Sequence, residues 1–414
     1  MKTDSNWFDD VRVGMFIHWG AYALAARGEW LKSNEKMTDE AYDRYVKFFN
    51  PDLFNPKEWA AVAKAAGMKY FVITAKHHDG FCLWDTQYTD YNSMKAPRCR
   101  RDLLKDIVEA FRAEGLRVGI YYSLPDWHHP GYVIDARHPQ RDNPVPREWQ
   151  RYTEFLHQQV RELLTHYGKV DLLWFDGAYP DTAHIWDSEK LNNLIRTLQP
   201  GIMINRLPGF SAFHSPEQAI PTNGVRDVKG NLLRWEGCQV FSGNTWGYGR
   251  YGLDQQAWKS APEIVQMLIR HTSRGGNLLL NVGPTSRGCL DNHSVSLLRE
   301  VAEWMRWNSR AIHGCTIAPE EFPEPEACRY TWNPETSTLY LHLFSWPDRR
   351  IFLPNLGGKV ELAQLLCDGS EILMTEHTPG NTHGAEVPPG NLMLSLPVQC
   401  PDTAVPVIEL FLKQ

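Results

Sequence analysis

The sequence predicts an α/β chain, with a (β/α)8-like TIM barrel over residues 1–316 and a small C-terminal β-sandwich over residues 317–414. Short apolar runs alternate with longer amphipathic stretches through the first three quarters of the chain. This alternation indicates a parallel sheet covered by helices on both faces. After residue 315, proline becomes frequent and helical periodicity stops. A length of 414 residues suits one barrel and a smaller partner domain.

Seven segments have the apolar, β-branched or aromatic composition of barrel strands. They are residues 13–19, 69–75, 117–123, 170–176, 202–206, 239–242 and 277–282. Seven such segments fit an eight-stranded barrel in which one strand is missed or degenerate in sequence. The alternative fold, a doubly wound sheet, usually shows a glycine-rich phosphate loop early in the chain.

The stretches between these strands predict amphipathic helices. Helices at residues 56–66 and 102–113 end near Gly67 and Gly115, and glycine is common just after a helix because it adopts left-handed backbone without strain. Further helices are predicted at residues 147–166, 188–198, 261–272 and 294–308. In the C-terminal region, short runs predict antiparallel strands at residues 328–332, 339–344, 350–353, 392–396 and 405–412.

Composition argues against several classes of protein. The formal net charge is −6 at pH 7 and no Lys/Arg cluster is present, so there is no electrostatic case for nucleic-acid binding. No apolar run approaches the roughly 18 residues that span a bilayer. The N-terminus shows no signal-peptide pattern, and the eight scattered cysteines form no C-x-x-C. A cytoplasmic protein with reduced thiols is therefore expected.

Five successive predicted strands end in polar side chains. The endings are Ile17-His18-Trp19-Gly20, Lys76-His77-His78-Asp79-Gly80, Tyr121-Tyr122-Ser123, Leu173-Trp174-Phe175-Asp176-Gly177 and Asn205-Arg206. Burial of a charge costs free energy unless the charge is paired, so a strand that serves only the core is not expected to end in these groups. Because active sites of TIM barrels lie at the C-terminal ends of the strands, the endings predict one convergent site.

Asp176 is the sharpest candidate in that site. An apolar strand carries it, and Gly177 after it is expected to permit close approach of a ligand. Arg206, one strand further on, would lower the pKa of Asp176 and keep the carboxylate ionised. Such a carboxylate, beside Trp174, could act as a glycosidase nucleophile. The structural alternative is that Asp176 caps the next helix.

These motifs resemble glycoside hydrolase family 29, the α-L-fucosidases. The resemblance covers residues 6–315, in the family's order. It rests on RVGMFIHWG at 12–20, GEW at 28–30, FNPKEW at 54–59, AKAAGMKY at 63–70, KHHDGF at 76–81 and WFDG at 174–177. The IHWG and HHDGF elements together are highly specific. The tail resembles the family's C-terminal β-sandwich only in character.

The resemblance implies a retaining exo-α-L-fucosidase that uses no cofactor and no metal, and that acts on a fucosylated oligosaccharide or glycoconjugate. It implies that Asp176 is the nucleophile. It also implies a fucose pocket lined by His18, Glu29, Trp30, His77, His78, Tyr121, Trp174 and Arg206, and closed by Trp246. His, Glu and Arg would bond the hydroxyls of fucose, while Trp and Tyr would enclose its methyl group.

Two glutamates compete for the role of acid/base catalyst. A retaining glycosidase needs a second carboxyl group about 5–5.5 Å from the first. Glu217 is favoured, since its segment resembles the acid/base loop of the family. Glu236, which follows Trp235, is the competitor, and it is alternatively a pocket or structural carboxylate.

Other functions stay open from the sequence. The histidines His18, His77, His78, His128 and His129 suggest a metal-dependent barrel hydrolase, although adjacent histidines on a strand point to opposite faces. A non-catalytic fucose-binding lectin on the same scaffold is disfavoured because both candidate carboxylates are present.

Two further features have plain structural interpretations. The sequence GYGRYG at 247–252 formally matches a dinucleotide motif. No helix opens immediately after it, so it is interpreted as a loop beside the pocket. Trp332 and Trp346 could bind carbohydrate on the C-terminal domain, but packing of that domain against the barrel is favoured.

Overall fold

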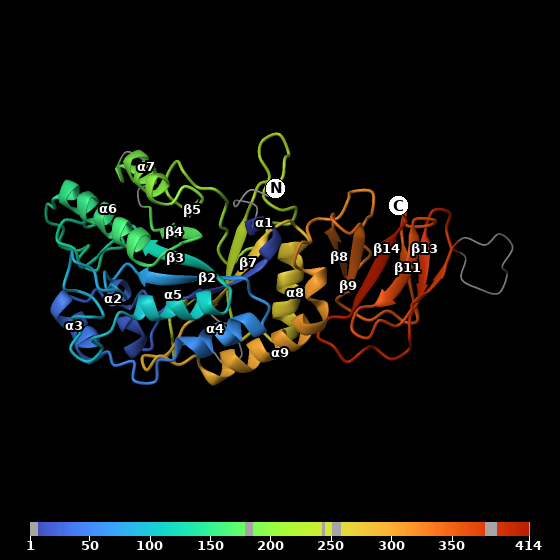
Figure 1. Ribbon diagram of the computed structural model, residues 1–414, viewed down its shortest axis with the longest axis horizontal. Coiled ribbons are helices and arrows are strands. Elements are labelled where there is room, and N and C mark those ends of the chain that lie inside the picture. The colour runs from blue at the N-terminus through green and yellow to red at the C-terminus, as the bar shows by residue number, and fades with distance from the viewer. Residues whose placement is uncertain (1–6, 179–184, 242–244, 251–257, 377–386, 414) are drawn as a thin grey trace.

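The computed structural model describes residues 7–178, 185–241, 245–250, 258–376 and 387–413. Figure 1 shows two bodies along the long axis of the molecule: a curled sheet surrounded by helices, coloured blue to light orange, and a group of β-strands, coloured darker orange to red. Within the described ranges, no helix is both long enough and apolar enough to cross a membrane. The order of the two bodies along the chain agrees with the predicted barrel and β-sandwich.

The first body contains, in its described residues, seven parallel strands that form one sheet. The strands are β1 (Val13–Ile17), β2 (Tyr70–Lys76), β3 (Arg117–Ser123), β4 (Leu172–Asp176), β5 (Met203–Asn205), β6 (Glu236–Val240) and β7 (Asn277–Val282). Their order is β5-β4-β3-β2-β1-β7-β6. Consecutive strands from β1 to β5 are therefore neighbours, as are β6 and β7, and β7 lies beside β1. The predicted TIM-like barrel is confirmed.

Residues 212–218 occupy the eighth position of the barrel, between β5 and β6. On one side, the amide of Ala212 donates to the carbonyl of Ile204 over 2.8 Å. On the other side, His214 pairs with Trp235 and Glu217 with Cys238 in parallel bridges. Irregular backbone therefore closes the barrel where a full strand would stand, and this segment carries Glu217.

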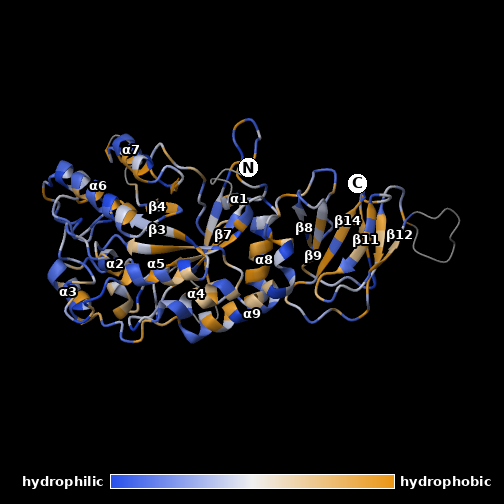
Figure 2. Cartoon of the chain, in the orientation of Figure 1, coloured by the Kyte–Doolittle hydropathy of each residue, from blue (hydrophilic) through white to orange (hydrophobic). Residues whose placement is uncertain are grey.

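Helices cover the outside of the sheet (Figure 1). They are α4 (Pro56–Ala65), α5 (Leu103–Ala113), α6 (Trp149–His166), α7 (Ser188–Leu198), α8 (Ala261–Thr272) and α9 (Asn292–Asn308). Each confirms a predicted helix to within two residues at its ends. Capping follows the sequence: Asp102 accepts from the amide of Lys105 over 2.9 Å, and Ser260 and Glu263 form a capping box. Figure 2 shows that these helices alternate hydrophobic and hydrophilic faces.

Further helical segments lie at the N-terminus and in the loop after β1. They are α1 (Trp7–Val11), η2 (Ala21–Leu24), α2 (Leu31–Asn34) and α3 (Asp39–Phe48), and η4 (Ser309–Ala311) follows α9. Helix α3 was not predicted, although its start is marked in the sequence. The hydroxyl of Thr38 accepts from the amide of Ala41, and Asp39 and Glu40 lie in the first turn.

Strand β6 corrects the predicted strand at 239–242, whose last residue lies outside the described ranges. The strand begins three residues earlier, at Glu236. Glutamate and glycine are both depleted in strands, but tertiary contacts accommodate both here. Partners on other strands bond the Glu236 carboxyl group. A Cβ at Gly237 would lie 2.3 Å from His271, so only glycine fits against that ring.

An apolar core fills the barrel interior. It includes Phe16 of β1, Tyr121 of β3, Trp174 of β4 and Leu279 of β7. Because side chains alternate along a strand, the residue two positions after each of these faces the same way, one layer nearer the mouth. This periodicity brings His18, Asp176 and Asn281 to the mouth.

The C-terminal region forms two antiparallel sheets that share a hydrophobic core. Their orders are β10-β13-β12 and β11-β14-β9-β8. The strands are β8 (Cys328–Asn333), β9 (Thr338–Leu343), β10 (Arg350–Leu353), β11 (Val360–Leu365), β12 (Leu373–Thr375), β13 (Leu392–Ser395) and β14 (Val407–Leu412). The predicted β-sandwich is confirmed, and β11 and β12 are additions to it. Trp332 and Trp346 both pack against its core.

Candidate active site

Asp176, the last residue of β4, accepts hydrogen bonds from two side chains at the barrel mouth. Tyr121 donates to Oδ2 over 2.9 Å, and Arg206 donates to Oδ1 over 2.8 Å. Nε2 of His78 lies 3.6 Å from Oδ2. Burial by itself raises the pKa of Asp176, but the positive charge of Arg206 and the hydrogen bond from Tyr121 outweigh it and hold the pKa below its ordinary value. Asp176 is therefore an anion at neutral pH.

Arg206 joins Asp176 to Glu217. Its Nη1 also donates to Glu217 Oε1 over 2.5 Å, and its Nη2 donates to the carbonyl of Ser215 over 2.8 Å. Since both carboxylate oxygens lie on one nitrogen, their separation cannot exceed the sum of the 2.8 and 2.5 Å distances. That upper limit is compatible with the spacing of about 5–5.5 Å in retaining glycosidases and lies below the roughly 6.5–9.5 Å spacing of inverting ones.

Glu217 differs from Asp176 in its access to solvent. Its side chain is 48% exposed, whereas that of Asp176 is 19% exposed. The sequence-based competitor, Glu236, has no exposed surface. The structure therefore brings Glu217 to Asp176, in the arrangement that the acid/base interpretation requires.

The structure corrects the prediction that Glu236 is an acid/base catalyst or a pocket carboxylate, because this residue does not lie in the pocket. It occupies the first residue of β6, at the opposite end of the strand from the barrel mouth. Tyr70 donates its hydroxyl to one carboxyl oxygen of Glu236, and the indole of Trp174 donates to the other over 3.1 Å. Burial raises the pKa of Glu236 to about 7. Because Glu236 has no exposed surface, neither oxygen can reach a sugar.

His18 is held in one tautomer. Its Nδ1 lies 2.6 Å from Oδ1 of Asn281, whose amide donates to the carbonyl of Trp246 over 2.6 Å. Since Oδ1 is thus the accepting end of the amide, Nδ1 of His18 carries the proton. Burial lowers the pKa of His18 to about 3. The neutral ring therefore has Nε2 free to accept from a hydroxyl group.

His78 is fixed in the same way. Its Nδ1 lies 2.5 Å from the hydroxyl of Ser123, which itself donates to the carbonyl of Pro125 over 2.6 Å. Nδ1 therefore donates, and the unprotonated Nε2 faces Asp176. Burial lowers the pKa of His78 to about 4.

His77 and His78 both follow the last residue of β2, so the alternation of a strand does not separate them. Their ring centroids lie 4.2 Å apart. His77 stacks on Tyr121, with centroids 5.7 Å apart and an angle of 8° between the planes. Its Nδ1 is buried and has no hydrogen-bond partner among the described residues. In the described ranges, no group of three or more His, Cys, Asp or Glu side chains is placed to hold a metal ion.

Glu29, Trp30 and Trp246 form the wall contributed by loops. Glu29 is buried and accepts from the amides of Trp246 and Gly247 over 3.0 and 2.7 Å. The ring of Trp246 lies 5.4 Å from that of His18, and Trp30 lies edge-on to His78 at 5.0 Å. The described part of the glycine-rich segment, residues 247–250, thus lies beside the pocket as predicted. Tyr251 and Gly252 lie outside the described ranges.

Gly177 packs closely against the loop after β3. Its φ is +75°, and a Cβ there would lie 2.5 Å from Pro125 and 3.1 Å from His78. The glycine therefore admits that loop, and it also lines the cavity beside Asp176. Asp176 does not cap the next described helix, since α7 begins at Ser188 with Asp187 as its N-cap.

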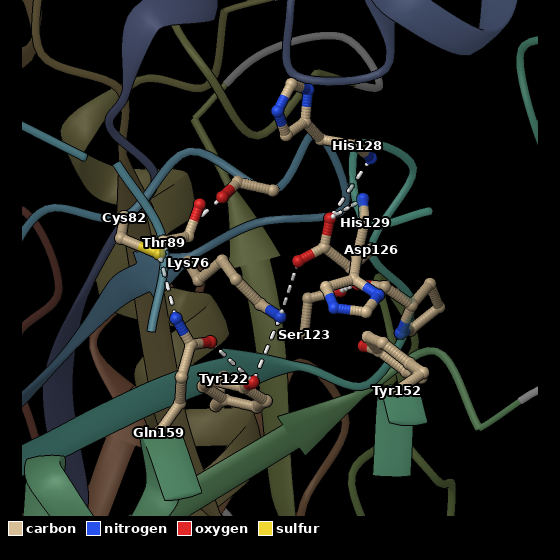
Figure 3. A network of polar contacts seen from close by, with 12 residues as sticks. Lys76, Cys82, Thr89, Tyr122, Ser123, Asp126, His128, His129, Tyr152 and Gln159 are labelled. Carbon is tan, nitrogen blue, oxygen red and sulfur yellow. Dashed lines mark hydrogen bonds and ion pairs between the residues drawn. The ribbon is translucent and has the colours of Figure 1, made fainter. Parts of the chain in front are cut away.

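A buried ion pair joins Lys76 to Asp126, as Figure 3 shows. Lys76 donates to Asp126 over 3.0 Å and to the hydroxyl of Tyr122 over 3.0 Å, and both charged groups are buried. The other oxygen of Asp126 accepts from the amides of His128 and His129. Burial raises the pKa of Asp126, but the charge of Lys76 more than offsets it, so the pKa is lowered overall.

This ion pair joins two chain segments that meet at the site. Lys76 immediately precedes the two histidines, and Asp126 begins the turn that contains Trp127. The amide of Trp127 donates to the carbonyl of His78 over 2.8 Å, and its ring packs at 5.3 Å from His78 and from Trp30. The sequence analysis missed Trp127 and Asn281, and it named Ser123 only as part of a polar strand ending. Asn281 had a signal, because it is a polar residue within the apolar strand β7.

A cavity of about 600 Å³ opens beside Asp176 and Arg206. Asp176 and Arg206 line its inner end, and small or apolar residues line the rest: Gly177, Ala178, Leu207, Pro208, Gly209 and Ser211. This space adjoins Asp176 and has few charged groups. It suits a leaving group of variable shape.

The chain is similar to proteins known as α-L-fucosidases. A family model described as alpha-L-fucosidase matches residues 2–310. The structure of α-L-fucosidase isoenzyme 1 from Paenibacillus thiaminolyticus is 42% identical, with a TM-score of 0.93, and the match covers 100% of this chain and 99% of that one. Plasma α-L-fucosidase from Homo sapiens is 29% identical over 375 residues, covering 82% of this chain and 76% of that protein.

A structure from Bacteroides thetaiotaomicron is also similar. It is a GH29 α-L-fucosidase, 29% identical, with a TM-score of 0.84, and the match covers 98% of this chain and 95% of that one. That structure shows a covalent intermediate trapped with 2-fluoro-fucosyl fluoride in a variant with glutamine in place of a glutamate. With the family model matching well over half of its length, this chain belongs to glycoside hydrolase family 29, the α-L-fucosidases.

Proposed function

We propose that this protein removes terminal α-L-fucosyl residues from oligosaccharides or glycoconjugates with retention of configuration, with Asp176 as nucleophile and Glu217 as acid/base. The observation that carries the assignment is the single Arg206 nitrogen that binds both carboxylates. It holds one carboxylate ionised beneath the sugar and the other at the spacing that double displacement requires.

The reaction takes two steps. Asp176 Oδ attacks the anomeric carbon while the protonated Glu217 gives its proton to the departing glycosidic oxygen, and the C–O bond of the substrate breaks. Water then attacks the same carbon. Glu217 accepts a proton from this water, and the bond to Asp176 breaks. Two inversions leave α-L-fucose.

The surrounding residues suit fucose. Neutral His18 and His78 present Nε2 acceptors to hydroxyl groups, and His77 has a buried nitrogen without a protein partner. Rings of Trp30, Tyr121 and Trp246 supply apolar surface for the C–H face and methyl group. We place the leaving group in the cavity lined by residues 177–178, 207–209 and 211.

The direct test is to trap the fucosyl-enzyme. Incubation with 2-fluoro-fucosyl fluoride, proteolysis and mass spectrometry should locate the label on Asp176. NMR of the first-formed sugar should show the α-anomer. Label on another residue would overturn the assignment, and a β-anomer would overturn the retaining mechanism. A panel of α-1,2, α-1,3, α-1,4 and α-1,6 fucosides then ranks the linkages.

We also propose a reducing compartment, the cytoplasm, for this protein. All eight cysteines lie in the described ranges and are free thiols, and four are buried: Cys82, Cys238, Cys315 and Cys328. Burial raises the pKa of each of these four, which makes them poorly reactive. Cell fractionation with activity measurement tests this, and activity confined to the culture medium would contradict it.

A further inference from the structure

Trp174 lies directly beneath the residues that bind Asp176. The guanidinium carbon of Arg206 is 4.5 Å from the centroid of its ring, and Tyr121 stacks on it with centroids 5.5 Å apart and a 20° angle between the planes. Arg206 and Tyr121 are the two donors to Asp176. The position of one indole ring therefore sets the position of both donors.

Glu236 anchors that ring from the interior of the barrel. Its Oε1 accepts the indole N–H of Trp174 over 3.1 Å, and its other oxygen accepts the hydroxyl of Tyr70. Phe16 packs against the ring at 5.3 Å, but an apolar contact does not fix which edge of an indole points downward. The carboxyl group does, because a hydrogen bond has a direction.

Burial of the Glu236 carboxyl group costs solvation free energy. Glu236 has no exposed surface, and a buried carboxyl without partners loses several kcal/mol of solvation. An apolar residue at this position would avoid the loss of solvation free energy. However, it would leave the indole N–H of Trp174 and the hydroxyl of Tyr70 without an acceptor. The arrangement is thus a satisfied polar unit, built under the catalytic residues.

We propose that Glu236 is a positioning residue for the fucosidase reaction, acting through Trp174 on Arg206 and Tyr121. The inference rests on the proposed roles of Asp176 and Glu217. It predicts that loss of the carboxylate acceptor lowers the rate of the chemical step more than it weakens substrate binding, because the donors to Asp176 shift while the loops around the sugar stay in place.

The chain offers a matched control. Glu162 of α6 is also buried, and it also accepts an indole N–H, from Trp84 over 3.1 Å, together with the hydroxyl of Thr86. It lies on a helix outside the barrel. Glu236→Met and Glu162→Met therefore remove the same kind of bond, one beneath the site and one away from it.

We expect Glu236→Met to lower kcat on an aryl α-L-fucoside about 100-fold while KM changes by about threefold or less. Glu236→Gln, whose amide oxygen still accepts from the indole, should restore kcat to within about fivefold of the wild type. Trp174→Phe removes the same bond from the other side and should lower kcat in the same way. It serves where Glu236→Met fails to fold.

Two results would overturn the inference. One is a folded Glu236→Met or Trp174→Phe variant with wild-type kcat. The other is an equal loss of kcat in Glu162→Met, which would show general destabilisation. Wild-type protein without turnover would instead refute the proposed function itself, so the two failures are distinguishable.

Discussion

Arg206 directly follows β5, the strand beside β4, and donates a 2.8 Å hydrogen bond to Asp176. Its backbone has a φ of +53°, a conformation that a residue with a side chain seldom adopts. This turn of the chain aims the guanidinium back over the barrel mouth, where it lowers the pKa of Asp176. Strain in the backbone thus coincides with the charge on which the site depends.

Removal of the nucleophile should abolish turnover without unfolding the chain. We expect Asp176→Ala to lower kcat about 1,000-fold or more, because the covalent step is lost. Added azide should enter the vacated space and give the β-fucosyl azide from an activated α-fucoside. Asp187→Asn, at the N-terminus of α7, is the control and should keep full activity. An Asp176→Ala variant with high kcat would contradict the assignment.

Removal of Glu217 should depend on the leaving group. An oligosaccharide needs a proton on its departing oxygen, whereas a nitrophenolate does not. We expect Glu217→Ala to lower kcat/KM about 100-fold or more on oligosaccharides and about tenfold or less on activated aryl fucosides. Equal losses on both substrates would show that another group donates the proton. Glu189→Gln, an exposed change on α7, is the control.

The pH at which the acid limb of the kcat/KM profile falls should depend on the positive charge of Arg206. Asp176 reacts as an anion, and the positive charge of Arg206 favours that anion, so its pKa is low. Arg206→Gln removes the charge, which raises the pKa of Asp176. The acid limb of kcat/KM then moves to higher pH. Arg234→Gln removes a surface arginine paired with Asp9 and should leave the limb in place. An unmoved limb in Arg206→Gln would assign it to another group.

The Lys76–Asp126 pair should be important for stability (Figure 3). Lys76→Met leaves a buried carboxylate without its cation, and such a change costs about 3–5 kcal/mol of unfolding free energy. Lys64→Met breaks an exposed pair with Glu114 and should cost about 1 kcal/mol or less. Urea unfolding monitored by tryptophan fluorescence compares the two. Equal losses would show that Lys76 is poorly coupled to Asp126.

Much of this architecture follows from local sequence. Apolar runs separated by amphipathic stretches determine a parallel barrel, because a strand buried on both faces has no polar positions to spare. The same rule makes polar strand endings conspicuous, and so His18, Asp176 and Arg206 could be found without coordinates. The motifs around them identified the family for the same reason: they are short, contiguous and tied to strand ends.

Tertiary structure decided which polar groups meet. Glu217 and Glu236 both follow plausible local patterns, yet one lies on irregular backbone at the mouth and the other at the far end of β6. Position along an inward-facing strand fixes depth in a barrel, and sequence does not reveal where an irregular segment places its side chain. The tautomers of His18 and His78 were equally hidden, since they depend on Asn281 and Ser123 from other strands. Contacts between distant segments decide which nitrogen carries the proton, because a hydrogen bond fixes a tautomer only when the tertiary structure has brought both partners together.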